Sequence, residues 1–295
     1  MQSIAATILA LVMTLGSFAA ALTGDQKTAD LLKQARAALG GDKLDKVQGL
    51  SASGTYQRQV GDRNLTGELS IDFQLPDKML RTETMSPMGD AVITMETGLN
   101  GDKLLRHSAT TGGGPNLMIR LTPPGGADEA QALRNARADF ARIVIAFLLA
   151  SPPVMPVEFT YGGQAESPDG KADVLDAKGA GSFAAKILID PSSHRPLMMV
   201  YQGVAPRIVM STQQAPPGSH PDPEQAKKAA EATAAAQSPP QLVDISMFFD
   251  DYRQIDGVWL PHHVSRSLDG KPNEEWTFKT IKVNPTFKPD TFTAK

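Results

Sequence analysis

The chain contains five histidines, the residue type that most readily binds metals or transfers protons near neutral pH. Two of them are neighbours in a predicted strand, where successive side chains point to opposite faces of a sheet, so they are not expected to bind one metal ion together. Of the other three, one lies in a predicted turn and one in a low-complexity segment. We therefore expect no metal site among the five, which are His107, His194, His220, His262 and His263.

Two pairs of adjacent carboxylates could supply acid–base chemistry, but the same alternation separates their side chains. They are Asp250–Asp251 and Glu274–Glu275, and neither pair predicts a catalytic dyad. The sequence contains no HExxH, GxSxG, SxxK or Walker pattern, and the three glycines at 112–114 are followed by a proline. We therefore expect no catalytic residues, no cofactor and no enzyme; a hydrolase is kept as an alternative.

Methionine is unusually frequent, with twelve in the chain, and most of those after residue 21 lie in or beside predicted strands. Its flexible, polarizable thioether suits surfaces that accept varied apolar ligands, and it also fills ordinary cores. A copper site would need clustered methionines, and the sequence has no repeated M-x-x-M run. The pattern indicates an apolar binding surface or core packing by Met79, Met85, Met88, Met95, Met118, Met155, Met198, Met199, Met210 and Met247.

The elements that must position these residues follow an apolar N-terminal segment. Residues 4–22 carry no charged side chain, and Ala19 and Ala21 are small residues of the kind that signal peptidases accept. We predict a signal peptide over 1–21, cleavage after Ala21, and a periplasmic protein with no further membrane span. Because no Lys or Arg precedes the apolar segment, a retained membrane anchor is the alternative.

The bulk composition excludes several classes of protein. The formal net charge is −3 in 295 residues, which gives no indication of the basic patch that nucleic-acid binding needs. The absence of cysteine excludes a disulfide scaffold, thiol catalysis and thiolate metal sites. The domain must therefore be held together by burial of apolar side chains.

The mature chain is predicted to contain two helices and about eleven strands. The helices cover residues 25–39 and 128–150, and the second half of the later one is apolar nearly all round. Residues 211–240 are a low-complexity segment without large apolar residues, which predicts a mobile insertion. The strands are expected at 50–60, 65–75, 78–85, 91–97, 157–167, 171–179, 182–190, 196–204, 242–255, 258–268 and 274–284.

Strands that follow one another without intervening helices argue against a doubly wound or barrel α/β enzyme. In residues 65–75, Leu69, Ile71 and Phe73 alternate with polar residues, as in an antiparallel strand with one wet face. The fold class predicted is mainly β (α+β): an incomplete, strongly curved antiparallel β-barrel whose concave face is covered by helices.

The chain resembles the LolA-like family of periplasmic proteins, which includes lipoprotein carriers, outer-membrane lipoprotein-sorting proteins and the regulator RseB. Four segments show the resemblance: LDKVQGLSASGTY (44–56), FQLPDKMLRTETM (73–85), KILIDPSSHRPLMMVYQG (186–203), and DYRQIDGVWLPHHVSRS with IKVNPTFKPDTF (251–292). The resemblance implies one LolA-like domain over 22–295, with the insertion at 211–240. One position departs from the lipoprotein carriers, in which an Arg precedes the strand-joining proline: here Leu75 precedes Pro76.

The resemblance also implies a function, which is to hold acyl chains or similar apolar ligands in the concavity of the half-open barrel. The partner would be a lipid or a lipidated protein. The alternative is an envelope interaction or regulatory module that binds a protein partner without a small ligand. The side chains expected to line the apolar cavity are Phe73, Leu75, Met79, Met95, Phe140, Val144, Phe147, Phe159, Met198, Val200, Phe248, Trp259 and Trp276.

Overall fold

The computed structural model describes residues 24–60, 63–86, 90–112, 117–120, 128–167, 170–204, 209–212 and 241–293. The predicted signal peptide lies outside these residues, and so does most of the predicted insertion. The first two residues of that insertion, Ser211 and Thr212, instead end a strand.

Two α-helices, two short 3-10 helices and fourteen strands make up the described chain. The helices are α1 (Gly24–Leu39), η1 (Gly41–Lys46), α2 (Glu129–Leu148) and η3 (Ala180–Ser182). The strands are β1 (Gly49–Val60), β2 (Arg63–Gln74), β3 (Lys78–Met85), β4 (Val92–Asn100), β5 (Lys103–Thr111), β6 (Leu117–Arg120), β7 (Val157–Ser167), β8 (Gly170–Gly179), β9 (Ala184–Ile189), β10 (Pro196–Val204), β11 (Val209–Thr212), β12 (Leu242–Ile255), β13 (Val258–Leu268) and β14 (Lys271–Val283).

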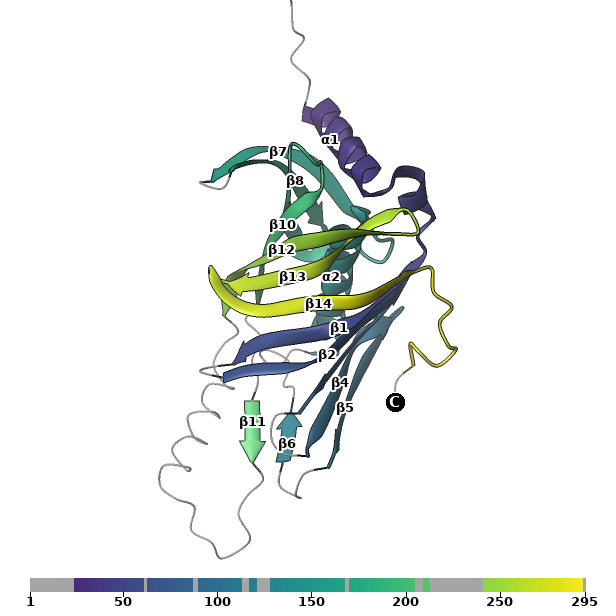
Figure 1. The fold of residues 1–295 in the computed structure, drawn as a ribbon, viewed down its shortest axis with the longest axis vertical. Coiled ribbons are helices and arrows are strands. Elements are labelled where there is room, and N and C mark those ends of the chain that lie inside the picture. The colour runs from purple at the N-terminus through teal and green to yellow at the C-terminus, as the bar shows by residue number, and fades with distance from the viewer. Residues whose placement is uncertain are drawn as a thin grey trace, which may run out of the picture.

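Twelve strands form one antiparallel sheet in the order β5-β4-β3-β2-β1-β14-β13-β12-β10-β9-β8-β7, and β6 pairs with β11 separately. The sheet is not closed, because β5 and β7 are its two ends and do not pair with each other. Figure 1 shows the strong twist and curvature of this sheet. The predicted open, curved antiparallel barrel is thus confirmed, with β5, β6 and β11 as strands that were not predicted.

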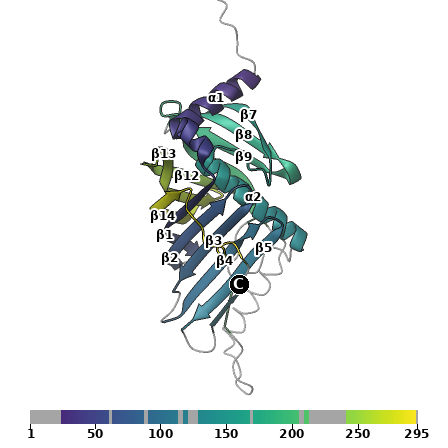
Figure 2. The same cartoon turned by 90° about the vertical axis from the view of Figure 1, so that its right-hand side faces the viewer.

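Helix α2 lies in the concavity of the sheet, between the part formed by β7–β9 and the part formed by β3–β5 (Figure 2). It begins where Asp128 accepts a hydrogen bond from the backbone N–H of Gln131 at 2.6 Å and so caps the helix. It ends at Leu149, which has a left-handed backbone (φ 46°). The buried residues of α2 gather in its second half, from Phe140 to Leu148, as the apolar composition there predicts.

Helix α1 packs mainly against β7 and is joined directly to the C-terminal end of α2. The guanidinium of Arg36 donates to the backbone carbonyls of Leu148 and Leu149 at 2.7 and 2.9 Å, and it also pairs with Asp45. A cation at a helix C-terminus satisfies carbonyls that have no partner within the helix. Arg36 therefore fastens the C-terminal end of α2 to α1.

Replacing Arg36 with alanine should lower the free energy of unfolding by about 1.5–3 kcal/mol, the range for hydrogen bonds from a charged donor. Chemical denaturation of Arg36→Ala measures this loss. The matched control is Lys33→Ala, an exposed position on the same helix, which should change the unfolding free energy by less than about 0.5 kcal/mol. Equal effects at the two positions would contradict the assigned role of Arg36.

Within the described residues, neither α-helix combines the length and the apolar character that crossing a bilayer requires.

Candidate functional site

The concave face of the sheet is a largely apolar surface on which α2 lies. Alternate residues of each strand point to this face, as the alternation in β2 shows, where Leu69, Ile71 and Phe73 are buried. Two aromatic contacts join the face to α2: the Phe73 and Phe140 ring centroids are 6.0 Å apart, and those of Phe147 and Phe278 are 6.1 Å apart. The concave face and α2 therefore share one apolar core.

Most of the side chains predicted to line a cavity meet in this core. Seven of them are buried together in this core, and they come from β2, β3, β4, β14 and α2. Three more are half-buried against it: Leu75 after β2, Phe159 on β7 and Trp259 on β13. The seven are Phe73, Met79, Met95, Phe140, Val144, Phe147 and Trp276.

Three of the predicted side chains point away from α2, to the outer face of the sheet. In β10, Met199 and Tyr201 are buried on the concave side, so the alternating Met198 and Val200 face outward. Phe248 lies opposite Met198 in the β10–β12 register and is 44% exposed. These three residues therefore do not belong to the surface beneath α2.

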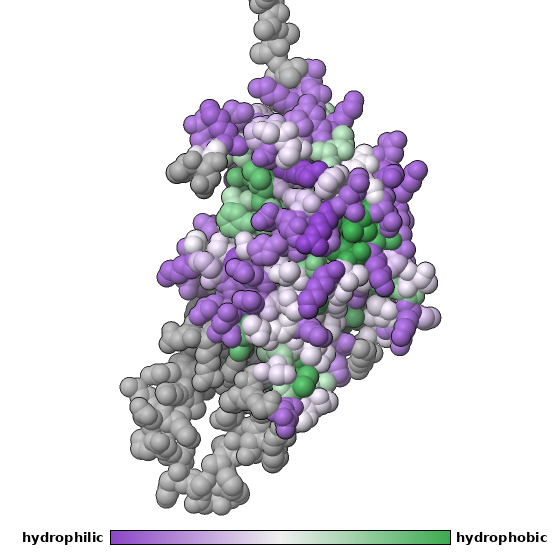
Figure 3. Space-filling view, in the orientation of Figure 1, coloured by the Kyte–Doolittle hydropathy of each residue, from purple (hydrophilic) through white to green (hydrophobic). Residues whose placement is uncertain are grey.

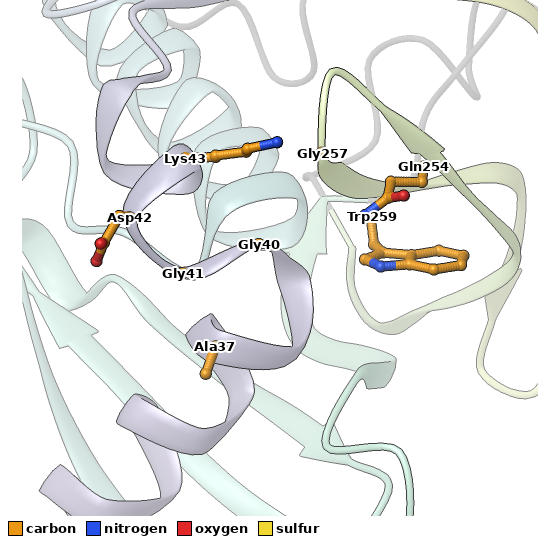
Figure 4. A pocket seen from close by; sticks show the side chains of 8 residues that line it. All are labelled: Ala37, Gly40, Gly41, Asp42, Lys43, Gln254, Gly257 and Trp259. Carbon is orange, nitrogen blue, oxygen red and sulfur yellow. The ribbon is translucent and has the colours of Figure 1, made fainter.

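Trp259 lies at a separate pocket of about 490 Å³ between η1 and the turn that joins β12 to β13 (Figure 4). Its indole is stacked by the guanidinium of Arg195 at 3.9 Å. A second pocket, of about 290 Å³, lies between β2, β4 and the C-terminal tail beside Phe287 and Phe292. Neither of these two pockets is lined by the residues that face α2.

Most of the methionines that the structure describes lie on the concave face, a placement that fits both interpretations of their frequency, an apolar binding surface and core packing. Five are buried there, on four strands, and belong to the same core as α2. They are Met79, Met85, Met95, Met199 and Met247. The long concave surface is therefore both apolar and rich in side chains that change rotamer easily.

A group of charged side chains interrupts this apolar surface, and we refer to it as the arginine–glutamate cluster: Arg58, Arg81, Glu83, Arg266 and Glu274. Arg58 contacts one oxygen of Glu83 and one of Glu274, both at 2.7 Å. Arg81 reaches the same two oxygens at 2.6 and 2.8 Å. The fifth member, Arg266, approaches only Glu274, at 3.4 Å.

Aromatic rings flank the cluster. The guanidinium of Arg58 lies 5.0 Å from the ring centre of Tyr56, and that of Arg81 lies 4.7 Å from the ring centre of Trp276. Gly67 makes room for this arrangement, because a Cβ there would come within 2.7 Å of the Tyr56 ring. The cluster is thus built into the packed face rather than attached to its rim.

The arginines control the ionisation of the two carboxyls. Burial alone would raise the pKa of Glu274, whose side chain is 1% exposed, but Arg81, Arg58 and Arg266 outweigh burial and lower this pKa to about 2. Burial likewise opposes ionisation of Glu83, and Arg81 and Arg58 lower its pKa. Both carboxyls are therefore ionised at neutral pH.

The sequence contains a signal for this cluster that is not visible when Glu274–Glu275 is considered only as an acidic pair. Glu274 alternates with Trp276 and Phe278, and Arg81 and Glu83 alternate with Met79 and Met85. In strands, such spacing places the charges on the same face as the apolar residues. The acidic pair itself behaves as predicted, because Glu274 is buried and Glu275 is exposed.

The remaining candidates for chemistry do not converge. His262 is buried, with Nδ1 3.1 Å from the carbonyl oxygen of Leu260, while His263 belongs to the other face. Asp250 and Asp251 are both exposed. His220 lies outside the described residues. In the part of the chain that the structure describes, no three His, Asp or Glu side chains are grouped as metal ligands would be.

No protein-family model and no curated protein matches the chain. Among solved structures, it is similar to a LolA superfamily protein from Nitrosomonas europaea (TM-score 0.44, 10% identity, 90% of this chain and 97% of that one). It is also similar to a DUF1329 family protein from Desulfovibrio piger (0.46, 9%, 90% and 96%) and to an outer membrane lipoprotein-sorting protein domain from Vibrio parahaemolyticus (0.44, 10%, 90% and 96%).

Proposed function

We propose that this protein is a periplasmic carrier that holds an apolar ligand, such as the acyl chains of a lipid or a lipidated protein, on the concave face of its sheet. The observation that supports this most is the architecture of that face. A long apolar and methionine-rich surface, in a sheet whose two ends do not pair, is covered by helix α2. The proposal assigns no catalytic residue.

The second half of helix α2 is packed more tightly against the sheet than the first half, and this difference suggests how a ligand reaches the surface beneath the helix. The second half is buried and its C-terminal end is fastened by Arg36. In the first half, Ala132 is the buried residue, and Arg137 pairs with the exposed Asp102 in the β4–β5 turn. Such surface ion pairs contribute little stability, about 0–1 kcal/mol. The first half of α2 is therefore the part that moves aside to admit an acyl chain.

The free energy of transfer favours this opening. Each methylene that leaves water for an apolar surface contributes about 0.8 kcal/mol. An acyl chain also replaces the apolar contacts that the first half of α2 gives up, so the concave face is not exposed to water in the loaded state. The methionines would adjust their rotamers to the shape of the chain.

Native mass spectrometry of protein purified without detergent tests the carrier function. The expected result is a fraction of molecules that carry extra mass corresponding to lipid, and apo molecules that take up an added fatty acid. A single apo mass that does not change when fatty acid is added would contradict the proposal.

The proposed location follows from the predicted signal peptide, since a carrier of apolar cargo is needed in an aqueous envelope. Sequencing the N-terminus of protein recovered from the periplasm should give Leu22 as the first residue, because cleavage is predicted after Ala21. An intact N-terminus in a membrane fraction would instead support the retained anchor.

A second candidate function, binding of a protein partner, is favoured by an apolar strip on the outer face of the sheet. The strip consists of Met198 and Val200 on β10 and Phe248 on β12, which lies opposite Met198. Phe248 is 44% exposed, whereas the outer face seen in Figure 3 is largely hydrophilic. Exposed apolar groups of this kind mark interaction surfaces more often than an isolated side chain does.

Photo-crosslinking in cells distinguishes this function from the carrier. A benzoylphenylalanine at position 248 should give one discrete protein adduct if the strip binds a partner, and the same probe at the exposed Lys279 of β14 should give none. The absence of any adduct specific to position 248 would remove the support for a partner site here.

A further inference from the structure

The arginine–glutamate cluster carries more positive than negative charge. Three guanidiniums face two carboxylates, so one positive charge is left over. The nearby Arg142 of α2 does not change this balance, because it pairs with Asp139 at 2.7 Å. The surplus positive charge is that of Arg266, because Arg58 and Arg81 each contact both glutamates.

The hydrogen-bonding capacity of the cluster is also incomplete, and the groups left over are donors. Nε of Arg266 and the hydroxyl of Tyr56 are buried without a hydrogen-bond partner among the described residues. Burial is the main cause that raises the pKa of Tyr56, to about 12, so the hydroxyl keeps its proton at neutral pH. Buried donors without acceptors are costly, and an anion supplies acceptors together with the missing negative charge.

Stability alone gives no reason to retain this cluster in an apolar face. Buried ion pairs are often no more stabilising than apolar side chains of the same volume. An arrangement with a surplus arginine is less favourable still, unless a further anion completes it. The side chain of Arg266 is 17% exposed and that of Arg81 is 21% exposed, so the cluster is reachable from outside.

The strand register relates the cluster to the apolar surface. Arg58 lies opposite Glu274, and Glu274 lies opposite Arg266, in one row across β1, β14 and β13. The next row inward contains Tyr56 and Trp276, and the row of Leu50 and Phe73 lies six residues further along β1. At about 3.3 Å per residue these last two rows are about 20 Å apart. An acyl chain in one leaflet of a bilayer extends over about 15 Å. A chain whose head group lies at the cluster would therefore fit along this length of the concave face.

We propose that the arginine–glutamate cluster binds the anionic head group, a carboxylate or a phosphate, of an amphiphile whose acyl chain lies along the concave face beneath α2. Arg266 supplies the charge that the head group neutralises, and the Tyr56 hydroxyl donates to it. This inference rests on the proposed carrier function and names the class of ligand: anionic amphiphiles are preferred over neutral ones of the same chain length.

The test uses tryptophan fluorescence, because the chain has two tryptophans and one of them, Trp276, lies against Arg81. All measurements are made in the Trp259→Phe background, in which Trp276 alone reports. Dodecanoate, dodecanol and inorganic phosphate are titrated separately. Dodecanoate should bind at least ten-fold more tightly than dodecanol, and phosphate alone should bind far more weakly than dodecanoate.

Substitutions of Arg266 then identify the source of this preference. Arg266→Gln balances the cluster at two charges of each sign, so the variant should still fold, which circular dichroism and a cooperative thermal transition verify, and should bind the two amphiphiles within about two-fold of each other. Arg266→Lys should keep most of the preference because it keeps the charge. The matched control is Arg253→Gln on β12, an exposed arginine that pairs with Asp251, which should leave the preference intact.

The outcomes separate the inference from the carrier function. If the protein with an unaltered cluster binds dodecanoate and dodecanol with equal affinity, the head-group site is overturned, but the proposed carrier function is not. Binding of neither amphiphile would overturn both. Tight binding of phosphate with no gain from an acyl tail would overturn the assignment to an amphiphile. A preference that survives Arg266→Gln, in a variant shown to be folded, would also overturn the inference.

Discussion

Replacing Glu274 with glutamine is expected to lower the free energy of unfolding by about 3–5 kcal/mol, the loss typical of removing one partner from a buried ion pair. The side chain of Glu274 is 1% exposed and faces Arg58, Arg81 and Arg266. Without its charge, three guanidiniums are left with Glu83 as the remaining carboxylate of the cluster. Urea denaturation at pH 7 measures the loss.

The neighbouring residue provides the matched control. Glu275 has the same chemistry on the same strand but is exposed on the other face, so Glu275→Gln should change the unfolding free energy by less than about 0.5 kcal/mol. If Glu274→Gln were as mild as Glu275→Gln, the cluster would not be the electrostatic unit described above.

The same carboxyl predicts how stability depends on pH. Burial opposes its ionisation, and the three arginines nonetheless lower the pKa of Glu274 from 4.5 to about 2 in the folded protein. A group whose pKa is lowered on folding stabilises the protein above its unfolded pKa and loses this contribution as the pH falls through the folded pKa. Unfolding free energies should therefore decline between about pH 5 and pH 2, by about 3 kcal/mol from this group.

Denaturation curves recorded at intervals across this pH range give the slope. In Glu274→Gln the slope should be much shallower, whereas Glu275→Gln should retain the slope of the unaltered protein. Parallel declines in all three proteins would show that other carboxyls are responsible.

The second large effect is expected from preventing the first half of α2 from moving. The chain has no cysteine, so Asp102→Cys with Arg137→Cys introduces the only two thiols, at positions whose side chains form an ion pair. Cross-linking them with a short bismaleimide joins α2 to the β4–β5 turn. Because the acyl chain must pass beneath this half of the helix, the affinity for a fluorescent fatty acid should fall at least ten-fold, about 1.4 kcal/mol.

The control for this cross-link lies in the β7–β8 hairpin. Glu166→Cys with Lys171→Cys replaces another exposed ion pair and leaves α2 free, so its cross-linked form should bind as the unaltered protein does. Single-cysteine variants blocked with a monofunctional maleimide control for the modification itself. Full affinity in the cross-linked Asp102–Arg137 pair would mean that α2 does not need to open there.

Much of the fold can be predicted from the local pattern of apolar and polar residues. The strands β5, β6 and β11, which were not predicted, show why the rest of the fold cannot. The alternation of Leu69, Ile71 and Phe73 fixes the concave face of β2, and most other strands carry a comparable signal. In β5 only Leu105 is buried, because this strand is at the edge of the sheet and most of its side chains reach solvent. Strands β6 and β11 have four residues each, too few for a periodic signal.

The candidate site was predicted in part, for reasons that lie in individual strands. In β10, Met198 and Met199 are adjacent and both apolar, so the sequence does not reveal which one faces the core. Pairing with β12 decides it, since Met199 lies opposite the buried Met247 and Met198 lies opposite the exposed Phe248. The arginine–glutamate cluster was missed because its members come from four strands and their complementarity appears only once those strands are placed side by side.

The central claim is that an apolar ligand lies between α2 and the concave face, and photolabelling tests it most directly. The protein is incubated with a fatty acid that bears a diazirine near the end of its chain, illuminated and digested, and the adducts are located by mass spectrometry. The predicted result is labelling on β2–β4 and on α2, at or next to Phe73, Met79, Met95 and Phe140. Labelling confined to the outer strip around Phe248 or to the pocket at Trp259, or no labelling at all, would contradict the claim.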